Sequence, residues 1–212
     1  MMVKSQLKFT SFCRVPMFVF GLIAQVVIYS TIGFLTPTLA IHLKSYEIET
    51  FWIGIFFSLP AVMYIVGSLL IQCYQTCISR RGIIFMAFVL LIISVFMIGT
   101  SPMLNIKDSP KLIFSGLCLL GLASSAITIP VLPEMLDQLV KEYPSLKNSS
   151  ELNDMTAGYF NGCLGLGEAI GPLMSSALVA GIGFRSACDF LALTCFVYVL
   201  LFFLFNGRSH IF

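Results

Sequence analysis

Residues 156–184 read TAGYFNGCLGLGEAIGPLMSSALVAGIGF, and this stretch decides the fold class of the chain. A helix rises about 1.5 Å per residue, and the hydrocarbon core of a bilayer is about 30 Å thick. The stretch is apolar over a length that crosses such a core, so it predicts a transmembrane helix at 156–181. Its remaining features predict a helix that packs inside a bundle rather than one that only anchors the chain.

Small residues recur in this span at a spacing that lets a second helix backbone come close. They form two glycine pairs with a following proline: Gly158 and Gly162, then Gly167, Gly171 and Pro172. Two polar residues, Asn161 and Glu168, are embedded among them. A carboxylate near the bilayer centre costs on the order of 3 kcal/mol, so such a residue usually faces a partner or a water-filled cavity.

The composition of the chain excludes a soluble protein. Of its 212 residues, 58% are hydrophobic and 10% are charged, whereas soluble domains carry about 25% charged residues. The net charge of +2 comes without a basic tract, so no nucleic-acid partner is expected. The seven cysteines lie almost all in apolar runs and form no CxxC pair or His/Cys cluster. We therefore expect no disulfide framework, no metal and no cofactor.

Apolar segments of bilayer length recur along the chain, and they predict a single all-α membrane domain over residues 1–212. The expected spans are 17–40, 52–77, 83–100, 112–134, 156–181 and 186–205. The polar stretch 137–154 is the only segment typical of the aqueous phase, and we expect a loop there.

The basic residues predict the orientation of the chain, because cytosolic loops carry an excess of Lys and Arg. Eight lie on one side and four on the other: Lys4, Lys8, Arg14, Arg80, Arg81, Lys141, Lys147 and Arg208 against Lys44, Lys107, Lys111 and Arg185. This difference places both termini and the 137–154 loop in the cytosol. The glycosylation sequon at Asn148 would then stay unmodified, and a glycan there would overturn the orientation.

Three spans carry polar residues on one helical face, which predicts a shared polar interior. These residues are Gln25, Tyr29 and Thr36 in the first span, Gly121, Ser125 and Thr128 in the fourth, and Asn161, Gly165 and Glu168 in the fifth. The alternative for any Ser or Thr is a hydrogen bond to its own helix backbone. Amides and acids in lipid need a partner instead. The third and sixth spans are apolar nearly all round and can face lipid.

Three segments stand out along nearly the whole chain: FLTPTLAIHL (34–43), IPVLPEMLD (129–137) and GYFNGCLGLGEAIGP (158–172). In their pattern and order they resemble the vesicular amine/polyamine transporter-like branch of the major facilitator superfamily. Such transporters have twelve spans in two six-helix halves, and this chain resembles the second half. The resemblance implies that the first and fourth helices line a central cavity. The second and fifth helices would pack against the other half, and the third and sixth would face lipid.

The chain also departs from that branch. Its monoamine carriers use embedded acids at three positions that are neutral here, namely Thr36, Ser125 and Asn161. Glu168 remains as a candidate for proton coupling, and the alternative is a hydrogen bond from Glu168 to a polar group across the interface between halves. The loop QCYQTCISRR (72–81) keeps Arg80 and Arg81 but lacks the acid of the family motif. The resemblance therefore implies a weakened closed-state latch, and the two arginines are expected mainly to hold topology.

The resemblance thus implies one half of a secondary transporter, of antiporter type, that moves a small organic solute by alternating access, with Glu168 as the candidate for proton coupling. The expected pathway residues are Gln25, Tyr29, Thr36, Ser125, Thr128 and Asn161. The second half would be a copy of the chain, a partner chain or a missing upstream part, in a vesicle, other endomembrane or plasma membrane. The alternative is a non-transporting scaffold or a regulatory orphan half. An enzyme is not expected, because no catalytic motif is present and His42 and His210 stand alone.

Overall fold

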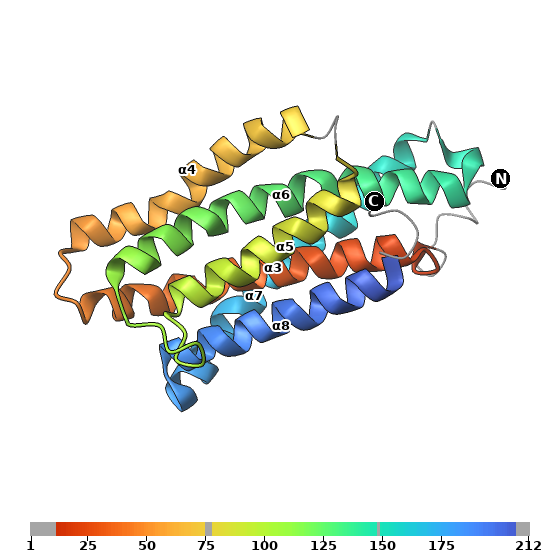
Figure 1. Ribbon diagram of the computed structural model, residues 1–212. Helices are drawn as coiled ribbons and strands as arrows, with labels where there is room; N and C mark the ends of the chain where they lie inside the picture. Colours follow the sequence, from red (N-terminus) through yellow and green to blue (C-terminus); the bar gives the residue numbers. More distant parts are fainter. Residues whose placement is uncertain (1–11, 75–77, 148, 207–212) are drawn as a thin grey trace.

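The computed structural model describes residues 12–74, 78–147 and 149–206, which form a bundle of long helices (Figure 1). Six helices in this part of the chain are long and apolar enough to cross a membrane, and it contains no strand. They are α3 (Pro16–Lys44), α4 (Thr50–Tyr74), α5 (Arg80–Ile98), α6 (Pro110–Glu142), α7 (Ser150–Ile182) and α8 (Phe184–Asn206). The predicted all-α fold with six spans is confirmed, and the chain is a multi-pass integral membrane protein.

The prediction of a loop over 137–154 is wrong, because both flanking helices extend well into it. Helix α6 continues to Glu142, a short 3-10 helix covers Pro144–Leu146, and α7 begins at Ser150. The segment from 137 to 142 contains good helix formers and nothing that breaks a helix. Tyr143 leaves the helical region (φ −123°, ψ 74°) because the following proline disfavours it there. The predicted end of the second span at 77, the sequon residue Asn148 and the basic residues Lys4, Lys8 and Arg208 lie outside the described residues.

The helices pair in a definite pattern. Helix α3 packs mainly along α7, while α6 packs between α4 and α5. Helix α5 also packs against α8, and α3 contacts α6. Figure 1 shows α4 along one edge of the bundle, beside α6.

The pairing of α3 with α7 depends on two glycines that bring the backbones together. A Cβ atom at Gly171 would lie 2.6 Å from the carbonyl oxygen of Ser30, and one at Gly167 would lie 2.9 Å from Cβ of Tyr29. Both distances are shorter than real carbon contacts, so only glycine fits at these two positions. The small-residue spacing therefore serves packing inside the chain at this pair.

Helices α4 and α7 are the most exposed of the six. Only 17% of the most apolar window of each is buried, against 61% for α3 and α5, 50% for α6 and 39% for α8. The most exposed side chains of α4 are large and apolar, including Phe51, Trp52, Val62, Ile65 and Leu69. A helix that is apolar nearly all round is therefore not necessarily exposed on the outside of the bundle. Helix α5 is apolar in this way, and it is among the most buried of the six helices.

Candidate functional site

A groove of about 640 Å³ lies between α3, α4 and α6. Its volume falls in the range of about 300–1,000 Å³ that small-molecule sites occupy. Helix α3 contributes Tyr29, Ile32, Leu35, Thr36 and Leu39, α4 contributes Phe57, Pro60, Ala61, Tyr64 and Ile65, and α6 contributes Leu117, Leu120 and Ser124. The groove is thus mainly apolar, with hydroxyl groups from all three helices.

Two of the hydroxyl protons in the groove are used by their own helices. Thr36 Oγ1 donates to the carbonyl oxygen of Ile32 at 3.2 Å, and Ser124 Oγ donates to that of Leu120 at 2.6 Å. This arrangement is the backbone bonding expected as the alternative for single Ser and Thr residues. Their oxygens can still accept a hydrogen bond from a ligand, while the hydroxyls of Tyr29 and Tyr64 can both donate and accept.

Tyr29 lies where four helices come together. Its Cβ abuts Gly167 of α7, and its side chain lines the groove between α3, α4 and α6. The hydroxyl of Tyr29 lies near Thr128 of α6 and interacts electrostatically with Glu168 of α7 and with Tyr64 of α4. Tyr29 is therefore the predicted pathway residue that links the groove to the candidate coupling residue.

The other predicted pathway residues do not line this groove. Gln25 is fully buried, and no described residue hydrogen-bonds either its amide oxygen or its amide nitrogen. Thr128 Oγ1 is likewise buried without a hydrogen-bond partner in the described part of the chain. Ser125 is buried against Gly67 of α4 and donates to the carbonyl oxygen of Leu122 at 2.8 Å.

The polar and small residues of α7 divide between two faces. Gly167 and Gly171 contact α3, whereas a Cβ atom at Gly158 or Gly162 would meet nothing within 4 Å. Pro172 contacts α3 at Gly33. The polar residues Asn161 and Glu168 are exposed, and neither has a hydrogen-bond partner among the residues described. Gly167 and Gly171 thus pack inside the bundle. Gly158 and Gly162 lie on an open face of α7, together with the two polar residues.

At one end of the bundle, arginines at the start of α5 pair with carboxylates of α6. Arg81 Nε donates to Glu134 Oε1 at 2.7 Å, and both side chains are largely buried. Gln138 Nε2 donates to the same oxygen at 3.0 Å, and the more exposed Arg80 pairs with Asp137. Neither partner was predicted from the sequence, although the spacing of Glu134 and Asp137 places them on one helix face. The two arginines therefore join helices α5 and α6.

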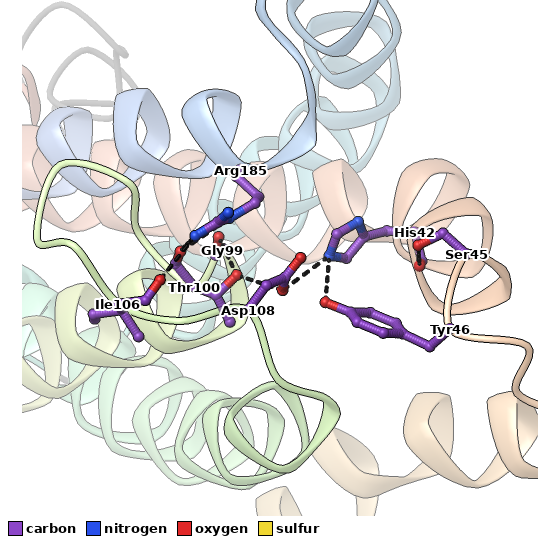
Figure 2. A network of polar contacts seen from close by, with 8 residues as sticks. All are labelled: His42, Ser45, Tyr46, Gly99, Thr100, Ile106, Asp108 and Arg185. Atoms are coloured by element: carbon purple, nitrogen blue, oxygen red, sulfur yellow. Dashed lines mark hydrogen bonds and ion pairs between the residues drawn. The ribbon is translucent and has the colours of Figure 1, made fainter.

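At the other end, a polar network joins three connections of the bundle (Figure 2). His42 Nε2 lies 3.6 Å from Asp108 Oδ1 and 3.4 Å from the hydroxyl of Tyr46. Thr100 Oγ1 donates to Asp108 Oδ1 at 2.8 Å, and Arg185 donates to the carbonyl oxygen of Thr100. The expectation that His42 stands alone is wrong, because Tyr46 follows it one helical turn later and Asp108 reaches it from the connection between α5 and α6.

The electrostatics of this network favour a charged Asp108. Partial burial opposes the carboxylate, but hydrogen bonds from Tyr46 and Thr100 and the charges of His42 and Arg185 lower the pKa of Asp108 below its usual value. Burial, together with the nearby Asp108 carboxylate, raises the pKa of the Tyr46 hydroxyl, which stays protonated as a donor. The network is thus held together by a carboxylate that accepts from several donors.

Comparison with known proteins adds no family assignment. No family model matches the chain, and no curated protein matches it. Within the described residues, no cluster of three or more His, Cys, Asp or Glu side chains could hold a metal ion. The resemblance to a transporter family stays a prediction from the sequence.

Proposed function

We propose that this chain is one six-helix half of a secondary active transporter that moves a small organic solute by alternating access. The observation that carries the proposal is the groove between α3, α4 and α6, which has the size of a solute site and lies between membrane helices. In the proposed setting both termini lie in the cytosol, and the membrane is that of a vesicle, another endomembrane or the cell surface.

The pairing of the helices supports this proposal. The first helix of the six packs on the fifth, and the fourth packs on the second. Likewise the third packs on the fourth, and the sixth, which packs mainly on the third, makes a smaller contact with the first. If the first, second and third helices exchange places with the fourth, fifth and sixth, the first–fifth pair becomes the fourth–second pair. The third–fourth pair likewise becomes the sixth–first pair. This is the relation expected of the two three-helix repeats that make up each half of a major facilitator transporter.

The exposed faces of α4 and α7 support a second half beside this one. A carboxylate and an amide on a membrane-facing surface need hydrogen-bond partners, and Glu168 and Asn161 lie exposed on α7. A second six-helix half that covers this face would supply such partners and close the groove. It would be a copy of this chain, a partner chain or an upstream segment.

The test is solute accumulation by the purified protein in proteoliposomes. The vesicles are incubated with a metabolite extract under an imposed pH gradient, and accumulated solutes are identified by mass spectrometry. We expect at least one solute to accumulate with the gradient, and Glu168→Gln to abolish the gradient-driven part. Glu151→Gln, at the exposed start of the same helix, is the matched control. Accumulation no greater than in empty vesicles would refute transport, and unchanged uptake by Glu168→Gln would refute the coupling role.

A second candidate function is a non-transporting scaffold or a regulatory orphan half. The observation that favours it is the position of Ser125 and Asn161, since neither neutral residue lines the groove. This function predicts that the chain co-purifies from native membranes with a full-length transporter. It also predicts no solute accumulation in the proteoliposome assay.

A further inference from the structure

We propose that the groove between α3, α4 and α6 takes an uncharged solute that joins a flat aromatic ring to hydroxyl or carbonyl groups. As a statement about a transported substrate this rests on the proposed function, whereas binding is a property of the groove itself. All the lining residues belong to this chain, so one copy holds the groove.

Aromatic rings form two walls of the groove. Tyr29 comes from α3, and Phe57 and Tyr64 come from one face of α4. Pro60 and Ala61 lie between the two α4 rings in sequence and also line the groove, and Ala61 contributes only a methyl group. Aromatic side chains favour ring-shaped ligands, which they contact in offset-stacked or edge-to-face geometry. The walls are therefore suited to a flat ring.

The hydroxyl groups give the groove a second, polar requirement. Thr36 and Ser124 present oxygens whose protons are already donated to their own helices, so toward a ligand these two act as acceptors. Tyr29 on α3 and Tyr64 on α4 add two further hydroxyls. A ligand with hydroxyl or carbonyl groups can satisfy these atoms, whereas a lipid acyl chain would leave them unpaired.

The groove lacks any fixed charge to pair with an ion. None of its lining residues is Asp, Glu, Lys or Arg, and Glu168, whose neighbour Gly167 abuts Tyr29, does not line the groove. An ammonium or carboxylate entering the groove would lose its hydration without gaining an ion-pair partner. The groove should therefore discriminate against charged analogues of the same solute.

The test uses adenosine as a neutral probe that combines a flat ring with hydroxyl groups. Saturable binding of tritiated adenosine is measured with the purified full chain in lipid nanodiscs by scintillation proximity. The competitors are 5′-amino-5′-deoxyadenosine, which replaces one hydroxyl by an ammonium, and adenosine 5′-monophosphate. We expect adenosine to bind saturably and both charged analogues to compete at least about tenfold more weakly, since each loses hydration without a partner.

Two variants locate the binding in the groove. Tyr64→Phe should weaken adenosine binding about two- to tenfold, the effect of one net hydrogen bond, and Ala61→Trp should abolish it by filling the groove. Tyr159→Phe makes the same chemical change on α7, away from the groove, and should have no effect. Each variant is checked for an unchanged size-exclusion profile.

The proposal is overturned if adenosine does not bind saturably, or if lipid alone displaces the bound adenosine. It is also overturned by equal or tighter binding of the ammonium analogue, or by equal effects of Tyr64→Phe and Tyr159→Phe. Adenosine binding without solute accumulation in proteoliposomes would leave this inference standing and reject transport. Accumulation of other solutes without adenosine binding would reject this inference and leave transport standing.

Discussion

The ion pair between Arg81 and Glu134 should be the most costly polar contact to break in the described bundle. The two side chains are only 10% and 11% exposed, and their atoms approach to 2.7 Å. Removal of one partner leaves the other charge buried and unpaired, which costs about 3–5 kcal/mol in the free energy of unfolding. By contrast, the pair between Arg80 and Asp137 is 36% and 58% exposed, and exposed pairs contribute about 1 kcal/mol or less.

The measurement is the free energy of unfolding from titration with dodecyl sulfate in mixed micelles. Glu134→Leu and Arg81→Met should each lower it by about 3–5 kcal/mol. The double variant should lose less than either single variant, because an apolar pair of similar volume leaves no buried charge. Arg80→Met serves as the control and should cost about 1 kcal/mol or less. Single variants that cost no more than this control, or a double variant that loses the sum of the two, would contradict a buried ion pair at Arg81 and Glu134.

Three further predictions concern packing, pH and a buried amide. Gly171→Val should lower the free energy of unfolding by about 1–3 kcal/mol through overpacking against α3, while Gly158→Val, on the open face, should change it by no more than about 0.5 kcal/mol. The pKa of Asp108 is lowered in the folded protein. Its carboxylate therefore contributes its full share of the free energy of unfolding above pH 3.8, the ordinary pKa, and this contribution is lost as the pH falls through the lower pKa of the folded state. Acid titration of stability should therefore be shallower in Asp108→Asn, and an unchanged titration would contradict this assignment. Gln25→Met should raise the free energy of unfolding by about 1 kcal/mol, because it removes a buried amide without partners. Gln138→Met should lower it, and a destabilising Gln25→Met would mean that the amide is satisfied.

The number and order of the helices could be predicted from the sequence because bilayer thickness fixes the length of an apolar run. The helix ends could not be predicted in the same way. Apolarity ends where the hydrocarbon ends, whereas a helix ends where its backbone is interrupted, as at Tyr143 before a proline. The helix that continues through Asp137 to Glu142 therefore escaped a prediction based on hydropathy.

The site was predictable only where polarity and helical phase agreed. Tyr29 and Thr36 share one face of α3, and both line the groove. The α4 wall, with Phe57 and Tyr64, carries no signal that distinguishes it from a span facing lipid. The partner of Arg81 lies 53 residues away in sequence, and no local spacing rule reaches that far. Long-range pairs of this kind need the packing of the helices.

The position of Glu168 ties the assembly of the protein to its proposed chemistry. The residue lies exposed on the open face of α7, next to Gly167, which abuts the groove residue Tyr29. Any second half that covers this face must offer Glu168 a hydrogen-bond partner, because an unpaired carboxylate in lipid is costly. In the proposed assembly, the contact made by Glu168 therefore contributes to docking of the second half. In the proposed transporter, a hydrogen bond from Glu168 across the interface between halves and the coupling role of Glu168 both depend on the same contact. Glu168→Gln should therefore alter the size of the assembly as well as any gradient-driven uptake.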